Sequence, residues 1–437
     1  MSIQNFPASL QGIIQQNFLE REFKEPLQSK IAYRSIADRE SIPNMIGETI
    51  TKTRAGLKSP ITTPSNPTNN TNLDNGMTPS TFSVEQYTLT LNQYNDTIDL
   101  NIINNKVGLG DQFLKNARVN GTQAAQSLDR IARNKLFNAY MGGNTRVRTT
   151  LGAPAATISV DDIRGYQNTF NVVGQVVAVS VANPVNVNVG LNTYSLQGTV
   201  ADGSNVSTAF GGVSGTLTLS TNVSVADGTA LNAVVHANAS TILRPSGRAT
   251  TAALTGADIL TMGLLLDAQA QLRNNAPMDA GNMKAFLDNK SMRQLFADPD
   301  FKTLFQGQYG SREYVDGMVF NLLGIDFVPT TEAPVQAPSG AVAVTVRRPI
   351  LVIGGALIEG DFAGMATMME NESQIVSVVD EVAMVTRPPL DRLGQIVAQS
   401  WYWIGDFCAP SDQTTNQNIV PTASNAYYKR AIVMETA

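Results

Sequence analysis

Hydrophobic positions recur every three or four residues between residues 111 and 141, which is the spacing of one face of an α-helix. The positions are Phe113, Ala117, Ala124, Leu128, Ile131, Leu136 and Tyr140. Charged side chains such as Lys115 and Arg118 fall on other faces, and Gly142-Gly143 is a typical helix end. The pattern predicts a helix of roughly 45 Å. Because a usual helix has only ~11–12 residues, we expect other parts of the chain to pack along this one.

Polar and apolar residues alternate in residues 48–54 and again in residues 86–91, which predicts two strands. Of the 26 residues at 59–84 between them, 19 are Ser, Thr, Asn or Pro, too polar to form a core. We therefore predict an extended β-hairpin over residues 49–95 with a long tip that becomes ordered only against a neighbour; an interdomain linker is the alternative. Residues 1–48 mix both signs of charge with scattered apolar residues, so we interpret them as an arm, with a surface helix as the alternative.

Residues 155–248 consist of short alternating runs rich in Val, Thr, Ser, Asn and Gly. Between Gly165 and Leu243 the only charged residues are Asp202 and Asp227, each followed by Gly in a sequence typical of hairpin turns. The pattern predicts an inserted all-β domain, an Ig-like sandwich over residues 155–248. Calcium binding is excluded as an explanation of the two Asp-Gly pairs, because two isolated carboxylates supply too few ligands.

Residues 249–345 return to mixed α and β patterns. A sequence similar to a capping box at Thr255–Asp258 predicts the start of a helix, and Lys284–Leu287 reads as a strand. Residues 346–437 add further strands, including an aromatic one in which Trp401 and Trp403 are expected to point the same way. The fold class that these elements predict is α+β.

Composition narrows the possible functions. Of the 437 residues, 43% are hydrophobic and only 15% are charged, against a usual charged share of about 25%. Such a small supply of charge suggests that much of the surface contacts other protein. The net charge of −5 excludes a broad basic face for nucleic acid. We find neither an apolar run long enough to span a membrane nor a secretion-signal pattern at the N-terminus.

The chain also lacks the usual residues of enzyme chemistry. Its single cysteine, Cys408, rules out an intrachain disulfide and fits a reducing cytoplasm. Its single histidine, His236, lies in a strand-like segment and cannot build a multi-histidine metal site or relay. No phosphate-binding loop of the Walker type occurs. We predict no catalytic residues, no bound metal and no cofactor, and therefore no enzyme.

The order of the predicted elements resembles the major capsid protein of tailed bacteriophages, which has the Hong Kong 97 (HK97) type fold. Three local sequences also resemble phage coat proteins: Gly307–Gly317, Gly324–Thr330, and Arg387–Asp391 with the following Trp401–Trp403. The resemblance implies six parts, in chain order: an N-terminal arm at 1–48, an E-loop at 49–95, a peripheral domain with its spine helix at 96–154, the inserted sandwich at 155–248, an axial domain at 249–345, and a return to the peripheral domain at 346–437.

The resemblance implies a structural protein that assembles into pentamers and hexamers of an icosahedral shell in the host bacterial cytoplasm. The shell encloses double-stranded DNA without sequence-specific binding and without a membrane. Because only about 48 residues precede the hairpin, a separate scaffolding protein is implied. A portal protein is a further expected partner, and the insertion is expected to contact its neighbour, a decoration protein or a host surface. The alternatives are a nanocompartment shell and a surface-layer or adhesion protein.

Six charged residues are candidates for contacts between subunits. Three lie on the predicted hairpin: Lys52, Arg54 and Lys58. The other three, Arg387, Asp391 and Arg392, place a carboxylate between two guanidinium groups at a Pro-Pro corner. Because Arg offers rigid paired donors, we interpret this corner as an ion pair, formed either within one chain or across a subunit boundary.

Overall fold

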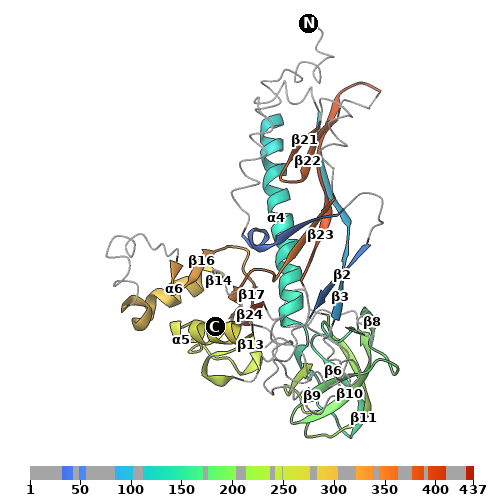
Figure 1. Ribbon diagram of the computed structural model, residues 1–437, viewed down its shortest axis with the longest axis vertical. Coiled ribbons are helices and arrows are strands. Elements are labelled where there is room, and N and C mark those ends of the chain that lie inside the picture. Colours follow the sequence, from blue (N-terminus) through green and yellow to red (C-terminus); the bar gives the residue numbers. More distant parts are fainter. Residues whose placement is uncertain are drawn as a thin grey trace, which may run out of the picture. The chain divides into compact units, whose positions relative to one another are not determined.

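The computed structural model describes residues 32–42, 49–55, 84–101, 112–170, 176–202, 213–236, 242–248, 250–275, 283–303, 321–338, 344–362, 376–387, 392–409 and 430–437. The chain divides into two compact units (Figure 1). Unit 1 comprises residues 1–50, 88–135 and 357–408, and unit 2 comprises residues 51–87, 136–356 and 409–437. Within the described stretches, no helix combines the length and apolar character needed to cross a membrane.

Unit 1 is built on a six-stranded sheet with the order β1-β20-β23-β22-β21, in which β4 also pairs with β23. The strands are β1 (Asp38–Ile42), β4 (Asn92–Asn101), β20 (Ile358–Phe362), β21 (Val376–Val379), β22 (Val382–Arg387) and β23 (Ile396–Cys408). Strand β23 is the longest, and its alternate residues are buried, including Trp401 and Trp403. The prediction that these two indoles share one face is therefore confirmed.

The helix α4 (Gln112–Met141) agrees with the predicted helix to within one residue. Five of its seven predicted apolar positions are buried: Ala117, Ala124, Leu128, Leu136 and Tyr140. The helix also buries Asn120, whose amide donates a hydrogen bond of 3.2 Å to the Gln399 carbonyl on β23. As expected for so long a helix, other parts of the chain pack along it.

Two further strands, β2 (Thr49–Ala55) and β3 (Val84–Thr90), pair in a two-stranded sheet. Where β2 begins and β3 ends, the hydroxyl groups of Thr49 and Thr90 are 3.2 Å apart. These strands have the positions predicted for the two sides of the hairpin. The predicted tip at residues 59–83 lies outside the described residues.

The β-rich part of unit 2 forms one six-stranded antiparallel sheet with the order β5-β12-β9-β10-β11-β6. The strands are β5 (Asn144–Arg146), β6 (Ala155–Val160), β9 (Val185–Val189), β10 (Asn192–Ala201), β11 (Gly215–Val223) and β12 (Ala233–His236). The two end strands meet, because Val147 forms a bridge with Val160 and the Arg148 N–H donates to the Ser159 carbonyl at 2.8 Å. The sheet thus closes into a small barrel. Strands β7 (Asn168–Phe170) and β8 (Val176–Ala178) form a separate pair.

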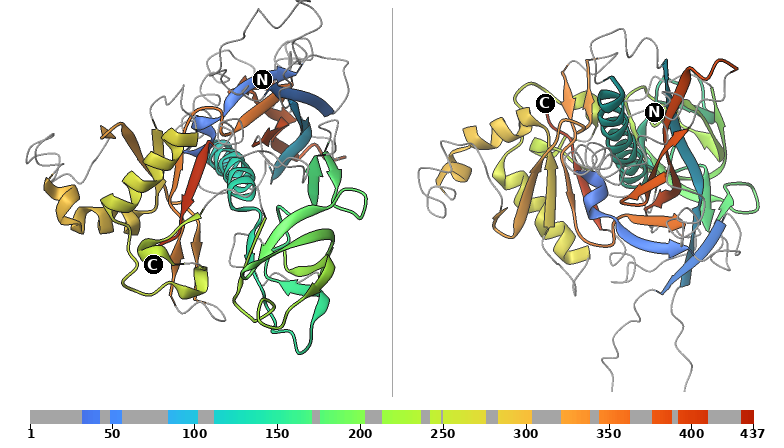
Figure 2. Two further views of the ribbon diagram at one scale, coloured as in Figure 1. Left: turned by 60° about the horizontal axis from the view of Figure 1, so that its bottom comes forward. Right: turned by 90° about the horizontal axis from the view of Figure 1, so that it is seen from above.

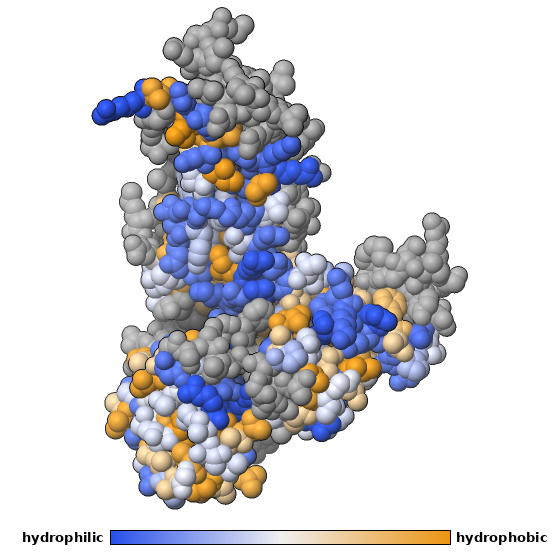
Figure 3. Space-filling view, turned by 180° about the vertical axis from the view of Figure 1, so that it is seen from behind, coloured by the Kyte–Doolittle hydropathy of each residue, from blue (hydrophilic) through white to orange (hydrophobic). Residues whose placement is uncertain are grey.

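The expected Ig-like sandwich over residues 155–248 was wrong in its arrangement of strands. Instead of two facing sheets, the described strands form a single closed sheet, and β5 joins it from before Ala155. The sequence could not separate these arrangements, because inward-facing residues alternate along the strands of sandwiches and barrels alike. Closure also leaves no unpaired sheet edge. The barrel encloses a core of mostly Val and Leu side chains, while its exterior in Figure 3 is largely neutral or hydrophobic.

The rest of unit 2 contains a mixed six-stranded sheet with the order β13-β24-β19-β14-β16-β15. The strands are β13 (Ile242–Leu243), β14 (Met283–Leu287), β15 (Asn321–Leu322), β16 (Ile325–Pro329), β19 (Ile350–Val352) and β24 (Ala431–Met434). Helix α5 (Met262–Asn275) packs against β19 and β24, and α6 (Asn289–Ala297) contributes Met292 and Leu295 to the same core (Figure 2). Strands β17 (Val335–Gln336) and β18 (Val346–Arg347) form a separate pair.

Two details of this sheet differ from the sequence prediction. Strands β19 and β24 come from the segment 346–437, which was expected to return to the domain of the long helix. The helix predicted to start at Thr255 is α5, which begins at Met262. The Asp258 carboxylate does accept a hydrogen bond of 2.7 Å from the Thr255 N–H, but it closes only a local turn. The helix start is capped instead by Asp298, which accepts a bond of 2.7 Å from the Met262 N–H.

Candidate functional site

The six predicted contact residues have different positions in the structure. Lys52 and Arg54 lie on β2, and Arg387 is the last residue of β22. Arg392 is exposed in the turn that leads into β23. Lys58 and Asp391 lie outside the described residues. The structure therefore brings Arg387 and Arg392 to one strand connection, and the ion pair expected at this corner stays a prediction.

A buried carboxylate on α4 fixes the segment that precedes β1. Asp129 is fully buried and accepts hydrogen bonds from the backbone N–H groups of Ala32 at 2.9 Å and Arg34 at 3.1 Å. Between these residues Tyr33 is also fully buried. Arg34 belongs to a short 3-10 helix (Tyr33–Ile36) that leads into β1. The segment before β1 is thus attached to α4 through its own backbone N–H groups. The sequence did not reveal this contact, because Asp129 has the pattern of any other charged residue on the helix.

Arg34 continues this attachment into the sheet. Its guanidinium donates through Nε to both carboxylate oxygens of Glu359 on β20, at 2.9 and 3.1 Å, and through Nη2 at 2.5 Å. The same guanidinium lies 5.9 Å from the centre of the Trp403 ring. Both side chains of the ion pair are almost completely buried. A buried pair with these hydrogen bonds strongly penalises the loss of either partner.

A second acid on β20 is held close to Glu359. Asp361 is only 9% exposed, and its Oδ1 atom has no hydrogen-bond partner among the described residues. Burial, followed by the negative charges of Glu359 and Glu381, raises the pKa of Asp361 to about 6, against the opposing effect of Arg39 and Arg34. The strand that pairs with the N-terminal β1 therefore carries a carboxyl group that gains its charge near neutral pH.

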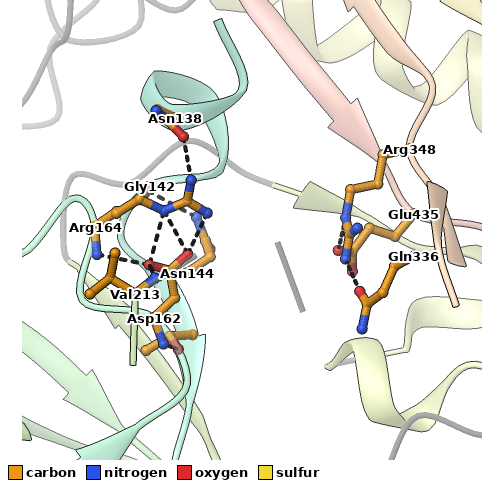
Figure 4. Close-up of polar contacts among 10 residues, drawn as sticks. Asn138, Gly142, Asn144, Asp162, Arg164, Val213, Gln336, Arg348 and Glu435 are labelled. Carbon is orange, nitrogen blue, oxygen red and sulfur yellow. Dashed lines mark hydrogen bonds and ion pairs between the residues drawn. The ribbon is translucent and has the colours of Figure 1, made fainter. Parts of the chain in front are cut away.

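Within unit 2, two glycines and an arginine join the end of α4 to the barrel, and Figure 4 shows Arg164 bonded to both Asn138 and Asp162. Gly165 has a φ of +82°, and a Cβ atom there would lie 2.1 Å from the Gly143 nitrogen, so only glycine fits. The Gly143 N–H donates to the Arg164 carbonyl at 2.9 Å. The Arg164 guanidinium binds the Asp162 carboxylate at 2.7 Å and also donates to Asn138 on α4. Backbone and side-chain bonds thus fix the barrel to the helix end.

The strand β24 is fixed by a buried cluster around Glu435. Glu435 pairs with Arg348 at 3.0 Å and with Arg244 at 2.7 Å, and it accepts a bond of 2.8 Å from the Thr251 hydroxyl. Figure 4 shows Arg348 between Glu435 and Gln336. Burial alone would raise the pKa of Glu435, but the two arginines outweigh it and hold the pKa at about 2.

At one end of the barrel, Asp227 organises the loop between β11 and β12. Its carboxylate accepts hydrogen bonds from Asn192 at 2.8 Å, Tyr194 at 2.7 Å and Ser224 at 2.9 Å. Burial alone would raise its pKa, but these hydrogen bonds outweigh it and hold the pKa at about 2. This residue therefore has the structural role in a turn that its Asp-Gly sequence indicated.

The described residues offer no arrangement suited to enzyme chemistry. His236 is 1% exposed inside the barrel, where burial lowers its pKa to about 4. Cys408 is the last residue of β23 and forms no disulfide. No group of three or more His, Cys, Asp or Glu side chains that could hold a metal occurs among the described residues. An open hollow of about 500 Å³ lies along α4, and its lining residues all come from that one helix.

The charged residues that hold the fold together were missed by the sequence analysis. Arg34, Asp129, Glu359 and Glu435 gave no motif, because each has its partner far away along the chain. The only available signal was local. Glu359 and Glu435 each follow an apolar strand residue, where an unpaired charge would be costly.

The comparisons with known proteins rest on structure alone. No family model matches the sequence, and no curated protein matches it either. The structure is similar to the capsid of the cyanophage P-SCSP1u, with a TM-score of 0.50 and 11% identity over 93% of this chain and 88% of the other. It is also similar to the capsid of Ralstonia phage GP4, with a TM-score of 0.50 and 8% identity over 94% and 91% of the two chains.

These matches extend over nearly the whole chain rather than over one common domain. The chain therefore has the mixed α/β fold of phage capsid proteins. The HK97-like fold predicted from the sequence is confirmed.

Proposed function

We propose that this chain is the major capsid protein of a tailed bacteriophage, which assembles into the icosahedral shell around double-stranded DNA. The observation that carries the proposal is the similarity in fold to two phage capsid structures over more than nine-tenths of the chain. The order of the elements along the chain also supports the proposal, because a 30-residue helix between a hairpin and a β-domain is an unusual arrangement.

The domain roles follow from the same proposal. Unit 1, with its long sheet and most of α4, corresponds to the peripheral domain, and the sheet with α5 and α6 corresponds to the axial domain. The strands β2 and β3 correspond to the base of the E-loop. The barrel, from Asn144 to His236, is the inserted domain, so its boundaries lie about ten residues before those expected from composition.

The buried ion pairs support a structural role. Arg34–Glu359 and Arg348–Glu435 each join segments far apart in the sequence, and neither lies in an open cleft. Such pairs favour a single arrangement of the chain. A subunit that is repeated many times in a shell needs one defined arrangement, because each copy must fit its neighbours. We infer that the protein is not an enzyme and needs no cofactor.

Contacts between subunits are proposed at two places. The first is the hairpin with Lys52, Arg54 and Lys58. The second is the connection from β22 to β23 with Arg387, Asp391 and Arg392. Here Leu393 is 76% exposed, and an exposed leucine beside cations suits a surface that is covered in the assembly. A scaffolding protein, a portal protein and a decoration protein are the further proposed partners.

The proposal is tested by expressing the full chain with and without the neighbouring genes of its genome, followed by electron microscopy of the purified particles. Closed icosahedral shells that require a second protein are expected. Shells that form without any partner and enclose a protein cargo would favour a nanocompartment. Filaments or flat sheets would favour a surface-layer protein and contradict the proposal.

A further inference from the structure

The open hollow along α4 carries positive charge that no described acid neutralises. The residues that line it are Lys115, Arg118, Val119, Thr122, Gln123 and Gln126. Lys115 and Arg118 are exposed and lie one helical turn apart, and neither has an ion-pair partner among the described residues. The helix itself supplies no partner, because its one acid is the buried Asp129. A segment with acidic side chains therefore complements this hollow, which we call the α4 hollow.

The α4 hollow is not uniformly cationic. Val119, which directly follows the second cation, is 55% exposed. Thr122 and Gln126 continue the same side of the helix, because residues three or four apart share a helix face. A DNA duplex presents phosphates along its whole length and would leave this apolar and neutral part of the hollow unused. A peptide segment with both acidic and apolar side chains fits the hollow better.

The first described residue of the chain is attached to the same helix, next to the hollow. The Ala32 N–H donates to Asp129 at 2.9 Å, and Asp129 is three residues beyond Gln126. Residues 1–31 lie outside the described residues, but they continue from this point of attachment. The tether gives them a high effective concentration at the α4 hollow.

The sequence of this segment has the complementary pattern. Glu22 and Glu25 are three residues apart, the same spacing as the two cations of the hollow. Ile14 and Phe18 precede them at steps of four residues, so one face of a helix here would carry two apolar side chains and then two acids. Pro26 follows directly, and a helix usually ends before a proline.

The connection between this segment and its point of attachment is long enough. Glu25 precedes Ala32 by seven residues, which span up to ~23 Å when extended. Lys115 precedes Asp129 by 14 residues of helix, which is ~21 Å. The acidic end of the segment can therefore reach the cationic end of the hollow within one chain.

We propose that residues 14–25 bind the α4 hollow of the same chain and run antiparallel to the helix. The two glutamates then lie at the two cations, and Phe18 covers Val119. Exposed ion pairs contribute little free energy by themselves, so the charges set direction and register while apolar burial and the short tether hold the segment. The inference concerns the single subunit and does not depend on the proposed function.

The first test uses the full chain as free subunits in a Cys408→Ser background, which removes the only native thiol. Phe18→Cys is combined with Val119→Cys, and disulfide formation under mild oxidation is followed by mass spectrometry of the peptides. The matched control combines Phe18→Cys with Asn134→Cys, another exposed position on α4. We expect an intrachain disulfide at least ~tenfold faster in the first pair than in the control, because docking raises the effective concentration of one thiol at the other.

The second test exchanges the charges within the first double-cysteine chain. Arg118→Glu should slow disulfide formation at least ~threefold, because Glu22 would then meet a like charge. The further change Glu22→Arg should restore the rate, since the ion pair forms again with its charges exchanged. Circular dichroism at each step checks that these substitutions leave the fold intact.

Four results would overturn the inference. The first is an equal disulfide rate at positions 119 and 134. The second is disulfides between two chains, seen as covalent dimers, which would assign the hollow to a neighbouring copy. The third is a rate lost in Arg118→Glu that Glu22→Arg does not restore. The fourth is an Arg118→Glu chain that keeps its disulfide rate but binds duplex DNA less well, which would assign the hollow to nucleic acid.

Discussion

Arg34 and Glu359 are 325 residues apart in the sequence and form a buried ion pair with hydrogen bonds to both carboxylate oxygens. The pair joins the first described segment of the chain to an interior strand of the unit 1 sheet, because β20 lies between β1 and β23. The N-terminal strand thereby becomes part of the sheet rather than an appendage to it.

Removal of one partner of this pair should destabilise unit 1 strongly. We expect Arg34→Ala to lower the free energy of unfolding by about 3–5 kcal/mol, because Glu359 would remain buried without a counter-charge. The double variant Arg34→Met with Glu359→Met should lose less. Both tryptophans of the chain, Trp401 and Trp403, lie in this sheet, so urea unfolding followed by their fluorescence reports on unit 1. Arg39→Ala, at a side chain 48% exposed, is the matched control and should have little effect.

Asp361 should make unit 1 less stable as the pH rises through about 6. Its pKa in the folded chain, about 6, is above the value near 3.9 expected when unfolded. The folded state thus binds the proton more tightly, and its stability falls as that proton is lost. Asp361→Asn should raise the urea midpoint at pH 7.5 more than at pH 4.5, whereas Asp38→Asn, at an exposed residue of β1, should not. Equal shifts at both pH values would contradict this assignment.

His236 should have the opposite effect on the barrel. Burial lowers its pKa in the folded chain to about 4, below the usual value of 6.5. The unfolded state therefore binds the proton more tightly, and barrel stability is lost as the pH falls from about 6.5 towards 4. Hydrogen exchange measured by mass spectrometry over β9 and β12 should show less protection at pH 4.5 than at pH 7, after correction for the intrinsic rates. Glu435 and Asp227, whose pKa values are about 2, should keep their contributions until lower pH. A His236→Gln variant should show a smaller dependence on pH, even if its barrel is less stable throughout.

Gly165 should tolerate no side chain. We expect Gly165→Ala to destabilise unit 2 by at least ~2 kcal/mol, because the left-handed backbone and the contact with the Gly143 nitrogen both oppose a Cβ atom. Gly152→Ala is the control, since nothing lies within 4 Å of its added Cβ and its φ is not positive. Thermal unfolding followed by circular dichroism measures both variants. Equal melting temperatures would contradict the prediction, because the backbone around Gly143 and Gly165 would then have shifted to accommodate the Cβ atom.

Leu393 should matter for assembly and not for folding. Leu393→Glu places a charge on a side chain that is 76% exposed, so the free energy of unfolding of the free subunit should change by less than ~0.5 kcal/mol. If the turn before β23 is covered in the shell, the yield of closed particles from Leu393→Glu, measured by sedimentation, should fall sharply. The control is Gln93→Glu at an exposed residue of β4, which adds the same charge and should assemble normally. Unchanged assembly of Leu393→Glu would remove this turn from the proposed contacts.

The sequence predicted some elements well for physical reasons. Helix α4 was located to within one residue because its apolar period persists over eight turns and ends at two glycines. The β-domain was recognised because its composition changes abruptly. Its closure into a barrel depends on the meeting of β5 with β6, which no local pattern encodes. The ion pairs of Arg34 and Glu435 were equally invisible, because a charge in the sequence does not name its partner.

The backbone bond of 2.8 Å from the His236 N–H to the Gly143 carbonyl has a consequence for how this barrel could be replaced. The chain enters the barrel and leaves it at neighbouring positions, so the whole insertion behaves as a loop whose ends already meet. The entropy of closing a loop depends only weakly on the length of the loop. A different domain with adjacent termini, inserted between Gly143 and His236, would thus connect to the rest of the subunit at the same two positions. The position is a natural point for the exchange of modules, by recombination in nature or by grafting in the laboratory.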